Sequence, residues 1–169
     1  MNIMKITAQL NDANKRVAKL LIRRILMHLV IEMLVKVAVK VIKKGLIHPH
    51  DLYDLGLALK AMLPVIESDD ITGKSAGLAE EVNQALSGLI TEQYECDNPV
   101  YCLITELISI INVDRELTAE IAAALKAALH LVQQCQEVES IEMAEQIQAA
   151  IANDLNQAAI QRQPSGITG

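Results

Sequence analysis

Residues 17–47 form the segment that most constrains how this chain can fold, because it is both strongly apolar and strongly basic. Of its 31 residues, 21 are Ala, Val, Ile, Leu or Met, yet no apolar run within it exceeds three residues. A membrane-spanning helix needs about 18 or more nearly uncharged apolar residues. We therefore expect this segment to be covered by protein and not to cross a bilayer.

The polar residues inside the segment recur at about every fourth position: Lys19, Arg23 or Arg24, His28, Glu32, Lys36, Lys40 and Lys44. Each α-helical residue turns by about 100°, so a four-residue step leaves a rotation of about 40°. The apolar surface of such a helix winds around its axis. This pattern predicts a long, largely buried helix that is enclosed on different sides at its two ends, either by its own bundle or by another subunit.

Large aliphatic side chains of this helix are the expected contacts in the core or between subunits: Leu26, Leu29, Val30, Ile31, Met33, Leu34, Val35, Val37 and Val41. A candidate basic surface lies beside them: Lys36, Lys40, Lys43 and Lys44. Interfacial membrane helices also combine basic and apolar faces, but they usually carry Trp or Phe. The basic surface could also meet phosphates, although no aromatic residue is interleaved with it for stacking on bases.

Positive and negative charge are separated along the chain. Ten of the fifteen Lys and Arg residues lie in the first 44 positions, whereas the remaining 125 residues carry five basic and nineteen acidic side chains. The net charge of −6 argues against a general nucleic-acid binder, since neutralising phosphates requires positive surface. We expect neither nucleic acid nor a membrane as the partner.

The core must be aliphatic, because the chain contains no Phe, no Trp and only three Tyr. Half of the residues are hydrophobic, which argues against disorder. Almost every segment has a helical pattern, and the short connections between segments favour antiparallel neighbours. The sequence predicts a single all-α domain over residues 1–162, built as a bundle of six or seven helices, with a flexible tail at 163–169.

Helix boundaries are indicated by capping residues. We expect the long helix to stop at Gly45, a second helix from Pro49 to about Pro64, and a loop over 67–75. Helices over about 76–94 and 99–112 follow, the latter capped by Asn98. Asp114 or Thr118 should cap a helix to about 137, and Ser140 should cap the last one.

One short segment is ambiguous. Residues 35–41 alternate valine with other residues, which is typical of a strand. No other part of the chain resembles a partner strand, and a lone strand leaves its backbone groups unpaired. Helix is therefore the favoured prediction for this segment.

The three cysteines, Cys96, Cys102 and Cys135, are an odd number in a chain of ordinary length. This predicts free thiols in a reducing compartment and a cytoplasmic location. Each cysteine is most simply a small buried hydrophobe.

No motif for catalysis, a cofactor or a metal is convincing. His48 and His50, with Asp51 and Asp54 nearby, could ligate Zn²⁺, but they are more simply capping residues around Pro49. Residues 73–75 read Gly-Lys-Ser but lack the earlier glycine and strand of a phosphate-binding loop. We expect no catalytic, cofactor-binding or metal-binding residues.

The functional prediction is therefore a non-enzymatic structural or assembly protein. It would self-associate through helices, chiefly through residues 17–47, as a homo-oligomer or with other protein subunits. A viral or phage assembly component, or an engineered assembly interface, fits this pattern. The alternative is an acidic helical module that binds or inhibits by occupying a basic protein surface.

Overall fold

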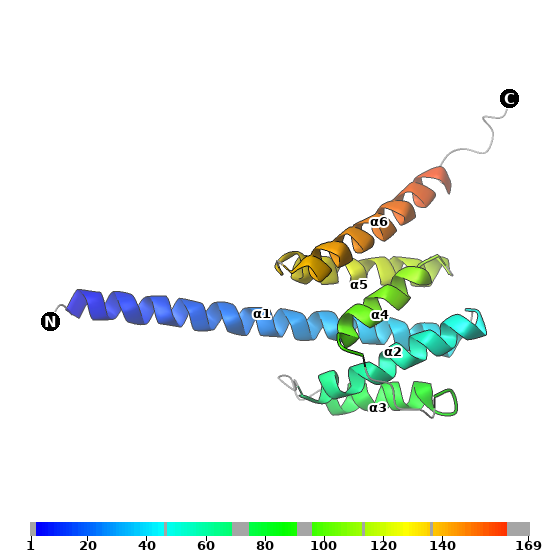
Figure 1. The fold of residues 1–169 in the computed structure, drawn as a ribbon, viewed down its shortest axis with the longest axis horizontal. Helices are drawn as coiled ribbons and strands as arrows, with labels where there is room; N and C mark the ends of the chain where they lie inside the picture. The colour runs from blue at the N-terminus through cyan, green and yellow to red at the C-terminus, as the bar shows by residue number, and fades with distance from the viewer. Residues whose placement is uncertain are drawn as a thin grey trace.

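The computed structural model describes residues 3–45, 47–68, 75–90, 96–112, 114–135 and 137–161, and the side chains of 75 and 154–161 are not part of that description. Within these ranges the chain forms six helices and no strand, as the sequence predicted (Figure 1). They are α1 (Ile3–Lys44), α2 (Pro49–Ser68), α3 (Ser75–Leu86), α4 (Pro99–Ser109), α5 (Arg115–Gln133) and α6 (Val138–Gln161).

The C-terminal half of α1 is the central element of the bundle (Figure 1). It contacts α2, α3, α4 and α5, whereas α6 packs on α5 and α4. Helices α2 and α3 lie on one side of α1, and α5 and α6 lie on the other (Figure 1). Helix α6 is therefore an outer element, separated from α1 by α5.

The buried half of α1 runs from His28 to Ile42. Residues 34, 35 and 38 have no exposed surface, and residue 41 is 1% exposed. The valine-rich stretch 35–41 is helical, because burial among the other helices outweighs the slightly lower helix propensity of β-branched residues. Gly45 ends the helix as predicted: its φ is +61°, and its N–H donates to the carbonyl of Val41 at 3.2 Å.

The expectation that α1 is largely buried is wrong for its first half. Every residue from 3 to 27 is exposed, and this half projects from the body as a straight rod (Figure 1). The reason is length. At 1.5 Å per residue, the 42 residues of α1 span about 63 Å, whereas the 19 residues of α5 span about 28 Å. The neighbouring helices are too short to cover the whole of α1.

Two predicted helix starts are confirmed. The side chain of Asn98 accepts a hydrogen bond from the backbone N–H of Tyr101 at 3.3 Å, and Pro99 occupies the first turn of α4. The side chain of Asp114 accepts from the N–H of Glu116 at 3.0 Å. Both caps satisfy N–H groups that have no partner inside their helix.

Three predicted boundaries are wrong. Helix α2 continues through Pro64 to Ser68; Pro64 is exposed, so water can hydrate the carbonyl that loses its N–H partner. Helix α3 ends at Leu86 and not near 94, because Gly88 adopts the left-handed conformation with φ +76°. Helix α6 begins before Ser140. The hydroxyl of Ser140 is buried and lies 2.6 Å from that of Tyr101, to which it is hydrogen-bonded.

The core is aliphatic, as the composition required. Its largest side chains with less than 2% exposure come from five of the six helices and one turn: Leu34, Leu55, Leu59, Met62, Ile66, Leu103, Ile104, Leu107, Ile110, Ile121, Leu125 and Ile147. The described part of α1 thus contributes to this core only beyond residue 27.

Candidate self-association surface

The exposed half of α1, residues 3–27, is called the arm. Its large apolar side chains are uncovered: Leu10 is 59% exposed, Val17 63% and Leu20 65%. Scattered single apolar residues are normal on a protein surface, but a contiguous apolar surface marks an interaction site. Thirteen of the sixteen exposed large hydrophobic residues in the described part of the chain lie on α1, and eleven of these are in the arm.

The apolar residues of α1 follow a heptad pattern. Alternating steps of three and four residues join Ile3, Ile6, Leu10, Ala13, Val17, Leu20, Arg24, Met27, Ile31, Leu34, Ala38 and Val41. We call this line the seam. Only Arg24 interrupts it. Residues at such spacing lie on one side of a helix and typically face a partner helix.

The seam runs along the whole of α1, but other helices cover only its C-terminal part. Its last four members, from Ile31 to Val41, are at most 4% exposed and pack inside the body. Its members up to Met27 are exposed. The same pattern that inserts into the bundle therefore continues, without cover, along the arm. This heptad spacing of apolar residues predicts a helix-packing surface along the arm. The prediction made from the sequence followed the polar residues, which recur about every fourth position, and did not consider the heptad.

Most basic residues of the arm lie on a face that borders the seam. Lys5, Arg16, Lys19 and Arg23 share this face with the acidic Asp12, because these five positions are separated by helical steps of seven, four, three and four residues. Together with Lys15 and Arg24 they give the arm a formal charge of +5. Since the whole chain carries −6, the remainder carries −11.

A groove marks the place where the arm leaves the body. It is lined by Leu20, Ile22 and Leu26, by basic residues of the same helix, and by Gln134 at the end of α5. Its volume is about 640 Å³. The basic residues in its lining are Arg16, Lys19 and Arg23.

The predicted contact residues divide between the two halves of α1. Val30, Ile31, Leu34, Val35, Val37 and Val41 lie in the core of the chain. In contrast, Leu26 is 46% exposed, Leu29 is 46% exposed and Met33 is 41% exposed. These three belong to the apolar surface that the bundle leaves uncovered.

The predicted basic surface is largely matched by carboxylates of the same chain. Lys36 pairs with Glu32 at 2.8 Å. Lys40 and Lys44 reach across to α5, and Lys40 pairs with Glu120 at 2.9 Å. The Lys40 and Lys44 pairs tie the end of α1 to the start and middle of α5.

Lys44 lies between two carboxylates at the start of α5. Its Nζ is 3.2 Å from Glu116 and 3.5 Å from Asp114. The hydrogen bond that Lys44 donates to the Glu116 carboxylate is the main reason that the pKa of Lys44 is raised. Lys43, the remaining member of the predicted basic surface, is exposed in the last turn of α1.

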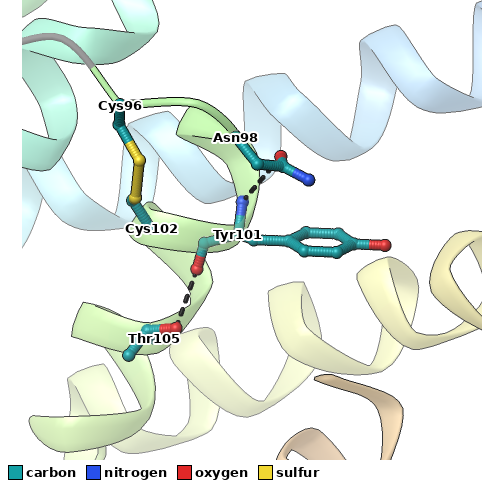
Figure 2. Close-up of a disulfide and its surroundings, with 5 residues drawn as sticks. All are labelled: Cys96, Asn98, Tyr101, Cys102 and Thr105. Atoms are coloured by element: carbon teal, nitrogen blue, oxygen red, sulfur yellow. Dashed lines mark hydrogen bonds between the residues drawn. A yellow bond between two sulfur atoms is a disulfide. The ribbon is translucent and has the colours of Figure 1, made fainter. Parts of the chain in front are cut away.

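The prediction of free, buried cysteines is wrong. Figure 2 shows a disulfide between Cys96 and Cys102 beside the Asn98 cap. The cap turns the chain at the start of α4 and brings the two cysteines together, although they are six residues apart. Cys135 is free but exposed. The inference of a reducing compartment from free thiols therefore no longer holds.

An acidic cleft of about 380 Å³ lies next to the disulfide and is lined by residues of α2, α4 and α6. Glu106 is partly buried in it, and this burial raises the pKa of its carboxyl. The negative charges of Asp54 and Asp51 raise the pKa further. The folded protein therefore holds the Glu106 proton more tightly than the unfolded chain does.

Replacing Glu106 by glutamine should stabilise the protein at neutral pH. Since the folded-state pKa is raised above the usual value of 4.5, ionised Glu106 disfavours folding once the pH exceeds that value. The gain should be at most about 1 kcal/mol, because the site is partly solvated. Denaturant titrations of E106Q and the parent protein from pH 3 to 7 test this: the difference should vanish at the acid end, and a pH-independent difference would contradict it.

The possible zinc ligands around Pro49, namely His48, His50, Asp51 and Asp54, form no metal site in the part of the chain that the structure describes. His48 and His50 stack with a centroid separation of 6.1 Å, and Nδ1 of His48 accepts the backbone N–H of His50 at 3.2 Å. No group of three or more His, Cys, Asp or Glu residues among the described residues could hold a metal. Gly73 and Lys74 lie outside the described residues.

Among the described helices, including α1, none is long and apolar enough to cross a membrane. The chain matches no protein-family model, and it shows no significant similarity to a curated protein or to a solved structure.

Proposed function

We propose that this protein is a non-enzymatic structural component that self-associates through the arm. The observation that carries the proposal is the exposed seam, in which Ile3, Leu10, Val17 and Leu20 continue the heptad pattern of the buried core. Full burial of one such side chain contributes about 1.5–3 kcal/mol. Covering several of them offsets an association cost of about 4–15 kcal/mol.

The acidic binding module is the second candidate. It is favoured by exposed glutamates at the start of α6, at positions 137, 139, 142 and 145. The cytoplasmic location stays a prediction, and the Cys96–Cys102 disulfide weighs against it, since cytosolic thiols are usually kept reduced.

The test is the mass of the protein in solution as a function of concentration, measured by light scattering after gel filtration. We expect a defined oligomer. Replacing Val17 and Leu20 by glutamate should lower the mass to that of the monomer while leaving the helix content unchanged, because both side chains are exposed in the single chain.

A matched control separates loss of the seam from added charge. The double variant Ala8→Glu and Asn11→Glu adds the same two charges to the arm at exposed positions outside the seam, and it should keep the parent mass. If the parent protein stays monomeric at high concentration, or if both double variants behave alike, self-association through the seam is wrong.

A further inference from the structure

The outer face of α6 combines exposed apolar residues with acidic residues, whereas the arm combines apolar residues with basic ones. On this face Val138 is 72% exposed and Ile141 52% exposed, with the exposed Glu142 and Glu145 one helical turn further on. The opposite face of α6 packs into the body through Met143, Ile147, Ala150 and Ile151. Helix α6 therefore presents an uncovered surface that is both apolar and acidic, which we call the α6 face (Val138, Ile141, Glu142 and Glu145).

Uncovered apolar surface is scarce outside α1. Among the described residues beyond α1, three large hydrophobic side chains are exposed, namely Tyr53, Val138 and Ile141. Two of these three lie on the α6 face. This face is thus the natural apolar counterpart of the arm within the described part of the chain.

Charge selects the α6 face over a second arm. The arm contains six Lys and Arg residues and a single acidic residue, Asp12. Two arms packed through their seams would bring the Arg16, Arg23 and Arg24 cations of both copies into one contact, which is destabilising. An arm on the α6 face instead places Arg16 and Arg23, which flank the seam, beside glutamates. Complementary charge across an interface favours the correct partner and register.

The arm of a chain does not lie along the α6 face of that same chain. The arm is continuous with the buried half of α1 and points away from the body, while α6 lies beyond α5 (Figure 1). Most of the length of the arm therefore extends beyond the body and does not lie along the α6 face of the same chain. A second copy supplies that face without any change of conformation.

We infer that the arm of one copy docks on the α6 face of a second copy, an inference that rests on the proposed self-association. The arm spans about 37 Å at 1.5 Å per residue, which is long enough to cover the α6 face. The two surfaces differ, so each copy offers one of each. Such a contact either closes in a reciprocal pair or a ring, or it propagates from copy to copy.

Charge reversal on each surface tests the inference in the full-length protein. Arg16→Glu with Arg23→Glu on the arm, and Glu142→Lys with Glu145→Lys on α6, should each raise the dissociation constant of the oligomer by about tenfold or more, which corresponds to about 1.4 kcal/mol. Combining all four substitutions should restore association, because opposite charges face each other again. Added salt should weaken the parent oligomer.

The control reverses two carboxylates elsewhere. Glu67→Lys with Glu80→Lys changes the net charge equally, at exposed positions of α2 and α3 on the other side of α1 (Figure 1). This variant should associate like the parent. Sedimentation velocity measures all the dissociation constants, and circular dichroism checks that each variant is folded.

The outcomes separate the inference from the proposed function. If the Val17 and Leu20 variant is monomeric but reversal on α6 changes nothing, self-association stands and the α6 face is wrong as its partner. If the parent is monomeric, both are wrong. A monomeric parent that co-floats with vesicles of equal parts phosphatidylserine and phosphatidylcholine would assign the arm to an anionic lipid surface and overturn both.

Discussion

Replacing Leu34 by alanine should lower the free energy of unfolding by about 2–5 kcal/mol. The Leu34 side chain has no exposed surface, and the four helices that contact α1 cannot collapse fully into the space that it leaves. Such substitutions lose the transfer free energy of the removed atoms and also leave a cavity. Since domains of this size are stable by about 5–15 kcal/mol, the loss is a large fraction of the total.

The arm offers a matched control for Leu34 on the same helix and the same seam. Leu20 is 65% exposed, so Leu20→Ala should change the free energy of unfolding by less than about 0.5 kcal/mol when the protein is dilute enough to be monomeric. Urea titrations of both variants measure the difference. Similar losses at the two positions would contradict the division of α1 into a buried half and an exposed arm.

The substitution Gly56→Leu should destabilise the protein by about 1–3 kcal/mol through overpacking. A Cβ atom at Gly56 would lie 2.5 Å from Cδ1 of Ile90 and 3.3 Å from Cδ2 of Leu86. The methyl of Ile90 can move for one added carbon, but a leucine side chain adds four. The absence of a side chain at Gly56 thus allows α2 to approach the end of α3 closely.

Gly77 provides the opposite case. It lies in α3, and a Cβ atom there would meet nothing within 4 Å. Gly77→Ala should therefore stabilise the protein by up to about 1 kcal/mol, since alanine is the better helix former. Thermal unfolding of the two glycine variants should shift in opposite directions. A destabilised Gly77→Ala variant would indicate that this face of α3 is more crowded than the structure indicates.

Local chemistry explains which parts of the fold could be predicted from the sequence. Gly45, Asn98 with Pro99, and Asp114 act through their immediate neighbours, so the helix ends that they define were predicted correctly. Ser140 was a wrong prediction because its hydroxyl is hydrogen-bonded to Tyr101, 39 residues away. No local pattern contains that contact.

The arm could not be distinguished from the core by its composition. From residue 17 to residue 44, which includes the exposed part 17–27, α1 consists mainly of aliphatic residues interrupted by polar ones about every fourth residue. Whether a given turn is buried depends on how far α2, α3 and α5 extend along it, and this is a property of the packed bundle. One sequence signal does differ: five cations fall within residues 15–24, next to the seam.

The continuity of α1 also fixes a distance. Residues 3–44 contain no glycine and no proline, the residues at which helices usually bend or break. A partner that binds the tip of the arm is therefore held at a fixed distance from the body, because a continuous helix has a fixed length. Inserting four residues near residue 25 would lengthen that separation by about 6 Å and rotate the arm by about 40° relative to the body.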